Sequence, residues 1–453
     1  MEPGLNTIEV RDQSGKRVDR ADVSLADESK KAVVNVEQLS PGTYTVQWKA
    51  LSADQHAMRG TFRFSVSQAA AASTTVTPSP SQALPSPAPT SQMETSEIND
   101  TGDKIGWRQT LVRWVSYLSM MILFGGFGFK LFVLTPAVGA SLEGGDKNKL
   151  LELGSRRVIA ISWVGAILLL VTSILALGLQ AADVFDKSFP SSFSPTVLVQ
   201  ALRTGYGPSW LLQIVSLSVL ILVLVLISKA RKVTRIHSIS WWVGLVAAMF
   251  LLLAPSWTGH AMLSALHFRL AVITDWLHLV AAGFWVGGLF HLAVNAKPVV
   301  SATSPEQRRG LLHYLIRSFT RIAIPSVVLL FLAGLYNTWA HVPAIRALWR
   351  TPYGRVLGVK LLVVLLMLLL GAVNNYYFGK RAARLADESD IKADADGRLE
   401  HSFWRSVRFE AALGVVVLFV TAVLVFLTPA RDHPAMDQAR SAEAFDVVGK
   451  NVR

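Results

Sequence analysis

The residues best suited to chemistry lie in one stretch, "SWTGHAMLSALHFRLAVITDWLHLVAAGFWVGGLFHL", residues 256–292. Asp275 and His278 are three positions apart, which places them on one face of a helix. The other candidates in the same stretch are His260, Met262, His267 and His291. Imidazole nitrogen, thioether sulfur and a carboxylate form a soft to borderline donor set. Such a set suits copper, in either oxidation state, better than magnesium or calcium.

Each of these residues also has an ordinary explanation. His260 and His267 fit interfacial positions, and Asp275 is shallow enough to be wet and structural. His278 is the hardest to explain in this way, because an unpaired histidine deep in a bilayer is costly. His291 is a weaker candidate than His278.

Other polar and thioether side chains in apolar runs have simpler roles. Met120 and Met121 fit core packing, for which methionine is often used. Lys360 and Arg113 fit snorkelling near the ends of apolar runs. Glu410 is less well explained by snorkelling because it begins a very apolar run, and a basic neighbour is its expected partner.

A second group of metal-type residues lies in "SADQHAMRG", residues 52–60, between the strand-like runs "YTVQWKAL" and "TFRFSV". Asp54 and His56 form a D-x-H corner, which could supply a carboxylate and an imidazole to a metal. Asp and His are also common in exposed turns, so the pattern alone is a weak signal.

Composition makes this chain a membrane protein. Of 453 residues, 51% are hydrophobic and 17% are charged, and several apolar runs are long enough to cross a bilayer. No cysteine is present, so disulfides, thiolate metal sites and c-type haem attachment are excluded. The net charge is +13, while residues 1–66 are balanced, so the excess charge belongs to the membrane part. We expect it to serve topology and anionic lipid contact rather than nucleic acid binding.

The pattern predicts a mainly α fold: an eight-helix transmembrane bundle preceded by a small, partial β-sandwich-like domain. We expect the β domain at residues 1–66, a Pro/Ser/Thr-rich disordered linker at 67–104, the membrane domain at 105–430 and a polar tail at 431–453. The predicted spans lie near 112–134, 158–180, 209–228, 238–258, 270–294, 322–342, 354–377 and 406–428.

Lysine and arginine in the short loops predict the orientation. The loop "SKARKVTR" has four basic residues and no acid, and the loops after the first, fifth and seventh spans are also basic. These four loops fit the cytoplasmic side, although the loop between the sixth and seventh spans carries three arginines. We therefore expect a multi-pass protein of the cytoplasmic membrane with both termini outside.

Two parts of the sequence resemble copper-resistance families. "PGTYTVQWKALSADQHAMRGTFRFSV" resembles the C-terminal half of the CopC domain, with Asp54 and His56 in step with the family's D-x-H corner. The segments "GHA", "DWLHLVAAGFWVGGL", "TPYGRVLGVKLLVVLLMLLLGAVNN" and "SVRFEAALGVVVLFVTAVL" resemble the CopD family. The resemblance covers nearly the whole chain outside the linker.

This resemblance implies a β domain that binds Cu(II), fused to a polytopic protein that moves copper across the membrane. In CopC domains the D-x-H corner supplies two ligands, and the mature N-terminal amine and its His supply the rest. The present sequence departs from that pattern: the opening "H-A-x-L-x-x-S-x-P" is absent, and Gln55 and Ala57 replace Gly and Pro. We expect half of the Cu(II) site and the leading strands to be missing, with a start further upstream as the favoured explanation.

The leading hypothesis is copper uptake by a carrier that is not an enzyme. Asp54 and His56 would capture Cu(II), and His260, Met262 and His267 would receive it. Asp275 and His278 would hold it part-way, with a more speculative exit site at His291. Copper ions and the bilayer are the expected partners, together with extracytoplasmic copper-binding proteins.

Two alternatives remain open. The first is a b-type haem redox protein with ligands among His260, His278 and His291. The second is a copper chaperone or assembly factor for a cuproenzyme. No P-loop and no D-K-T-G-T motif occur, so ATP-driven transport by this chain alone is not expected.

Overall fold

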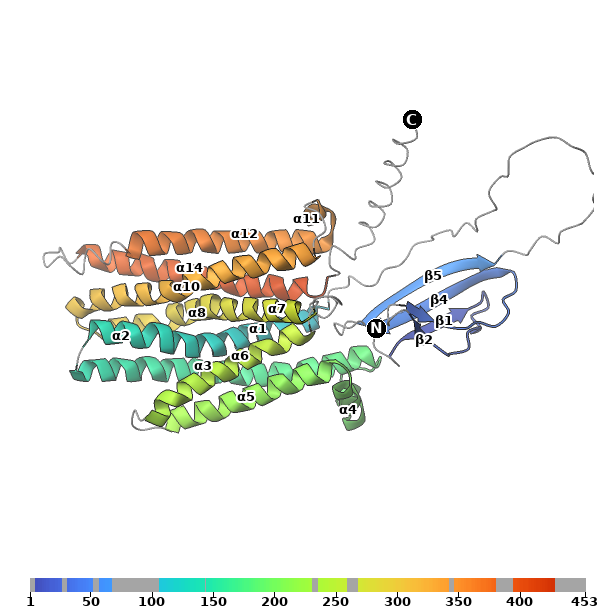
Figure 1. Cartoon of the computed structure of the whole chain (residues 1–453), viewed down its shortest axis with the longest axis horizontal. Coiled ribbons are helices and arrows are strands. Elements are labelled where there is room, and N and C mark those ends of the chain that lie inside the picture. Colours follow the sequence, from blue (N-terminus) through green and yellow to red (C-terminus); the bar gives the residue numbers. More distant parts are fainter. Residues whose placement is uncertain are drawn as a thin grey trace, which may run out of the picture. The chain divides into compact units, whose positions relative to one another are not determined.

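The structure is a computed structural model, and it describes residues 5–26, 31–51, 57–66, 106–142, 144–229, 235–258, 268–341, 346–379 and 394–427. It contains two compact units, Met1–Lys104 and Ile105–Arg453, the first built of strands and the second of long helices (Figure 1). Each is described by itself.

The first unit contains two antiparallel sheets. One has the strand order β1-β4-β5, from β1 (Thr7–Arg11), β4 (Gly42–Leu51) and β5 (Ala57–Val66), and the other pairs β2 (Ser24–Ala26) with β3 (Lys31–Val33). The long hairpin β4–β5 is in continuous register from Gly42↔Val66 to Leu51↔Ala57. The antiparallel β fold predicted from the alternating runs is confirmed, whereas the two short strands were not predicted.

The core of this unit is small, and one acidic side chain organises its border. Val10, Tyr44 and Val46 are buried, and the Tyr44 ring stacks on its cross-strand partner Phe64 with centroids 5.4 Å apart. Asp19 accepts hydrogen bonds from the amides of Val10 (2.8 Å) and Ala21 (3.1 Å) and from Arg17. All of these bonds hold the segment after β1 against the sheet.

The second unit is a bundle of long helices. Its elements are α1 (Trp107–Gly128), η2 (Phe129–Leu134), α2 (Thr135–Ser141), α3 (Gly144–Val184), η3 (Ser191–Phe193), α4 (Pro195–Arg203), α5 (Tyr206–Lys229), α6 (Arg235–Thr258), α7 (Phe268–Ala282), η5 (Gly283–Gly287), α8 (Gly288–His291), η6 (Leu292–Ala296), α9 (Lys297–Ser301), α10 (Pro305–His341), α11 (Ala347–Arg350), α12 (Pro352–Val373), η7 (Asn374–Gly379) and α14 (Asp394–Leu424).

Eight of the described helical segments are long and apolar enough to cross a membrane, which confirms the predicted architecture. They are Trp107–Ser141, Gly145–Val184, Tyr206–Lys229, Ser238–Trp257, Leu270–Ser301, Gln307–Thr338, Pro352–Tyr376 and Glu400–Leu424. Many of their outward-facing side chains are large and apolar, as expected for a surface in contact with lipid.

The candidate residues are distributed between the two ends of the bundle. α1, α7 and α12 begin at one end, which we call the Trp107 end, and run toward the other, which we call the Asn374 end (Figure 1). α14 runs the opposite way: Arg113 near the start of α1 lies over the ring of Phe426, 4.7 Å from its centroid.

The centre of the bundle is a close crossing between the first and fifth spans. A Cβ on Gly125 would collide with the backbone of Gly287, and a Cβ on Gly287 would collide with the carbonyl of Met121. Small residues allow such close approach between membrane helices. Both spans also contain π-helical turns, η2 in the first and η5 and η6 in the fifth. Such turns are often found at functional sites.

Candidate functional site

The candidate residues of the fifth span lie on α7, and Trp276 fixes that helix in the bundle. Its indole Nε1 donates to the backbone carbonyl of Met249 on α6 (2.9 Å). Asp275 precedes this anchor in α7 and His278 follows it by two residues. Their relation to the α6–α7 interface is therefore fixed by a side chain that was not among the predicted site residues.

His278 carries the most informative single atom of the bundle. Its side chain is only partly exposed, yet its Nδ1 atom is buried and has no hydrogen-bond partner among the described residues. Buried polar atoms are usually satisfied, so such an exception calls for an explanation. A free imidazole nitrogen inside a bundle is available to bind a metal ion.

Two further side chains act electrostatically on this part of α7. The positive charge of Lys360 on α12 acts on the His278 ring, and Asp275 acts on Lys360 and on Tyr117 of α1. We call Tyr117, Asp275, His278 and Lys360 the outer polar group. Asp275 thus supplies a negative charge that acts on the ammonium group of Lys360.

The structure leaves this group incomplete as a metal centre. Among the described residues, no three His, Asp or Glu side chains lie close enough together to hold one metal ion. The remaining predicted ligands of the membrane part, His260 and Met262, lie outside the described residues, as does His267. Asp54 and His56 of the β unit also lie outside the described residues.

His291 has a different environment from His278. It is fully buried on α8, and its Nε2 lies 2.8 Å from the backbone carbonyl of Ile122 while its Nδ1 lies 2.7 Å from Nδ2 of Asn295. The Asn295 amide donates to Nδ1, so the ring is a neutral imidazole that donates from Nε2. Both nitrogens are therefore engaged, and copper could bind His291 only if one of these bonds were released.

The glycine crossing makes room for this histidine. A Cβ on Gly126 would lie 3.0 Å from the His291 Nε2 atom and 2.9 Å from the Ser162 hydroxyl. The Phe129 ring is stacked beside the imidazole, with centroids 6.1 Å apart. His291 and Asn295 form the inner polar pair, which locks the first span to the fifth.

The methionines of the first span lie near this crossing. Met120 and Met121 are both buried in the apolar core, and the Met121 carbonyl faces Gly287. Packing accounts for both side chains. Both side chains lie in the interior of the bundle, at a depth between that of His278 and that of His291, so their sulfur atoms are also placed there.

A buried carboxylate that was not among the predicted site residues lies on α14. Glu410 is 3% exposed, and its Oε2 accepts a hydrogen bond of 2.9 Å from Nδ2 of Asn374. The expected basic partner is therefore not what Glu410 contacts; an amide takes that place. The sequence signal for this pair was the acidic residue at the start of an apolar run, together with the "NN" at the end of the preceding span.

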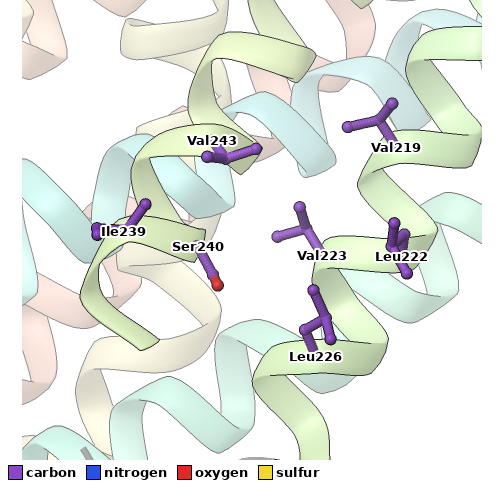
Figure 2. Close-up of a pocket in the computed structure, with 7 residues that line it drawn as sticks. All are labelled: Val219, Leu222, Val223, Leu226, Ile239, Ser240 and Val243. Atoms are coloured by element: carbon purple, nitrogen blue, oxygen red, sulfur yellow. The ribbon is translucent and has the colours of Figure 1, made fainter. Parts of the chain in front are cut away.

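One cavity of the bundle offers no set of metal ligands. It has a volume of about 220 Å³ and lies between α5 and α6, lined by Val219, Leu222, Val223, Leu226, Ile239, Ser240 and Val243 (Figure 2). Figure 2 shows aliphatic side chains around it and one hydroxyl, that of Ser240. Such a lining suits hydrocarbon and offers no ligand for copper.

Three models of known protein families match this chain, and together they cover parts of both units. The CopC domain family matches residues 1–67, the family described as "Copper resistance protein D-like, N-terminal domain" matches residues 103–266, and "Copper resistance protein D" matches residues 313–424. No solved structure matches the chain significantly.

Two curated proteins are similar along most of the chain. The copper transport protein CutJ of Bacillus subtilis (strain 168) is 25% identical over 452 residues, which is 98% of this chain and 72% of CutJ. The inner membrane protein YebZ of Escherichia coli (strain K12) is 24% identical over 325 residues, which is 70% of this chain and 97% of YebZ.

The fold and these matches define a multi-pass membrane protein with a copper-related function. Three copper-resistance family models thus match successive parts of the chain, which is similar to a CopC domain followed by a CopD-like membrane domain. The resemblance seen in the sequence motifs is thereby confirmed.

Proposed function

We propose that this protein transports copper across the cytoplasmic membrane in the direction of uptake, as a carrier rather than an enzyme. Asp54 and His56 capture Cu(II) outside. His260 and Met262, with His267, receive it. The outer polar group then holds it at His278, with Asp275 supplying the nearby negative charge.

One observation carries this proposal: the buried Nδ1 atom of His278 has no hydrogen-bond partner in the described part of the chain. A neutral imidazole with a free lone pair binds copper well. The printed name of the similar protein CutJ supports the same function.

The proposed orientation places the Trp107 end outside the cell. Basic residues at the opposite end support it, namely Lys147, Lys149, Arg156, Arg157, Lys229, Arg308 and Arg309. An excess of Lys and Arg in short loops marks the cytoplasmic side. Both termini would then be extracytoplasmic.

Copper flux into proteoliposomes that contain only this protein tests the proposal. The wild type should accumulate copper, supplied as Cu(I) or as Cu(II), and His278→Ala should reduce the rate at least about tenfold, the loss expected when a ligand is removed without replacement. His401→Ala is the matched control, because His401 is exposed near the start of α14, at the Asn374 end of the bundle and away from His278. Wild-type flux in His278→Ala would overturn the assignment of this residue.

The alternatives give different results in the same preparation. A chaperone or assembly factor would bind copper without moving it across the bilayer. A haem protein would show Soret and α bands on reduction. The bonds to both ring nitrogens of His291 make it unavailable as an axial haem ligand in this arrangement.

A further inference from the structure

The pair formed by Glu410 and Asn374 is not explained by copper binding or by helix packing alone. Glu410 is 3% exposed and Asn374 is 7% exposed, and they join α14 to the end of α12. Asn374 uses its amide nitrogen to bond Oε2 of Glu410, which leaves its own Oδ1 buried without a partner in the described structure. Two carboxylate oxygens and one unused amide oxygen therefore meet at one point inside the bundle.

The space around the carboxylate is kept open by a glycine. A Cβ on Gly371 would lie 3.2 Å from Oε1 of Glu410. Any larger residue there would press on the oxygen that Asn374 does not bond. The site thus offers oxygen ligands only, with neither nitrogen nor sulfur, which suits a proton or a hard cation rather than copper.

The pair lies at the same depth as His291. A Cβ on Gly414 would lie 2.8 Å from Cγ1 of Val286, so these two residues face each other across the bundle. Glu410 is about one turn from Gly414 toward the Asn374 end, and His291 is a similar distance from Val286 in the same direction. A cation leaving the bundle at this end passes the level of Glu410.

Among the side chains that the structure describes, no neutralising charge faces Glu410 from the helices packed against α14. At its own depth the only titratable side chain of α8 is His291, η6 has none, and Tyr376 of η7 is 68% exposed. Lys360 of α12, about 21 Å along that helix from Asn374, lies toward the Trp107 end. The other titratable groups on these helices are Arg108, Arg113 and Tyr117 of α1, Tyr353 and Arg355 of α12, and Tyr377 of η7, with Glu400, His401, Arg405 and Arg408 on α14 itself.

The arginines nearest to Glu410 in sequence do not neutralise its carboxylate. Arg405 and Arg408 are exposed on the outer side of α14, and no salt bridge to Glu410 is present in the part of the chain that the structure describes. An isolated carboxylate inside a membrane protein is costly when ionised, and a bound proton removes that cost.

We propose that Glu410, positioned by Asn374, is the proton-binding site that exchanges with copper during transport. In the resting state the carboxyl group holds a proton taken from water. When copper enters from the outer side, the proton leaves to the water on that side and the carboxylate charge offsets that of the metal. After copper leaves to the inner side, the carboxylate takes up a new proton from the water on the inner side, so each cycle moves one proton opposite to copper. This inference rests on the copper transport proposed above.

Glu410→Gln is the decisive variant because it keeps the shape of the protonated acid but cannot release a proton. Proteoliposomes loaded with a pH-sensitive dye would report interior pH while copper enters. In the wild type, copper influx should raise the interior pH. In Glu410→Gln the copper-dependent change should fall to the level of protein-free liposomes. Glu400→Gln is the matched control, since Glu400 lies on the same helix, is less buried than Glu410 and accepts a hydrogen bond from Trp404 (3.1 Å).

Infrared difference spectra between acidic and alkaline pH give a second measurement that needs no transport. The protonated-acid carbonyl band of the wild type should contain a component that Glu400→Gln keeps and Glu410→Gln loses, seen as a difference between the wild-type and Glu410→Gln spectra. Copper influx with no pH change, an equal pH change in Glu410→Gln, or dependence on a sodium gradient instead would overturn the inference. If the wild type moved no copper at all, the proposed function would fail, and the infrared band would still decide whether Glu410 binds a proton.

Discussion

The two histidines of the fifth span lie on one continuous membrane segment and have opposite environments. His278 has a buried ring nitrogen with no partner, whereas both nitrogens of His291 are bonded, to Asn295 and to the Ile122 carbonyl. Residue type and depth in the membrane are therefore insufficient to separate a candidate ligand from a packing residue. The hydrogen bonds already made by the side chain are the basis on which we propose His278, and not His291, as the ligand.

The same criterion applies to the acidic residues. Glu410 has an amide partner but no counter-charge in the described part of the bundle, while Asp19 of the β unit is bonded to two amides and to Arg17. We expect Glu410, which lacks a counter-charge, to take part in ion movement. We expect Asp19, which has one, to contribute only stability.

The largest effect on the bundle should come from the crossing that lies between the levels of the two histidines. Gly287→Ala adds a Cβ that collides with the Met121 carbonyl and lies 3.0 Å from Cα of Gly125. Both are backbone atoms that cannot rotate away, so the cost should approach about 3 kcal/mol. Thermal unfolding in detergent would measure it.

Gly334→Ala is the matched control for that substitution. Gly334 lies in α10, and a Cβ there would meet nothing within 4 Å. Because alanine favours helix, this variant should be as stable as the wild type or slightly more stable. Equal melting temperatures for Gly287→Ala and the wild type would show that the two spans do not need this close approach.

The next effect separates the two histidines directly. His291→Ala removes two buried hydrogen bonds and should lower the stability of the bundle by about 2 kcal/mol. Copper binding by the remaining protein should be unchanged. His278→Ala should give the opposite pattern, with normal melting and a smaller amount of bound copper than the wild type.

Calorimetric unfolding and copper titration of the same two variants would measure both quantities. Loss of copper binding in His291→Ala with an unchanged melting temperature would contradict the contrast between the two residues. Asn295→Ala offers a milder version, because it removes only the bond to Nδ1 of His291 and leaves the one to Ile122.

The sequence was sufficient for the architecture because apolar length is a strong signal. The eight spans follow from runs that match the thickness of a bilayer, and the alternating runs gave β1, β4 and β5. Helix ends were less predictable. The second predicted span covered 158–180, yet α3 extends over Gly144–Val184, because "KNKLLELGSRR" contains no proline and its single glycine is tolerated inside a helix.

The environment of each candidate residue could not be read from the sequence. The partner of Glu410 lies 36 positions away on another helix, and the partner of the His291 Nε2 atom is a backbone carbonyl 169 positions away. Neither pairing has a local pattern, because each depends on how the helices cross. The π-helical turns that rotate the fifth span were also not predicted, since single turns of this kind leave no periodic signal.

The smallest effect should come from the acidic residue with the most complete set of partners, Asp19. The hydrogen bond from Arg17, strengthened by bonds from the Val10 and Ala21 amides, lowers the pKa of Asp19 to about 2. The ordinary pKa of an aspartate is about 3.9, so the folded state favours the charged form. This contribution is fully present above about pH 4 and is lost as the pH falls toward 2.

Asp19→Asn should therefore destabilise the β unit by about 1 kcal/mol near neutral pH, a discounted figure because Arg17 is 40% exposed. The difference from the wild type should shrink as the pH falls from about 4 to about 2. Hydrogen exchange of the Val10 amide in the full chain would report it locally, with exposed Glu37→Gln as the control. Copper binding should be unchanged in Asp19→Asn. A loss of bound copper would instead place Asp19 among the ligands and contradict the view that fully bonded acids serve stability alone.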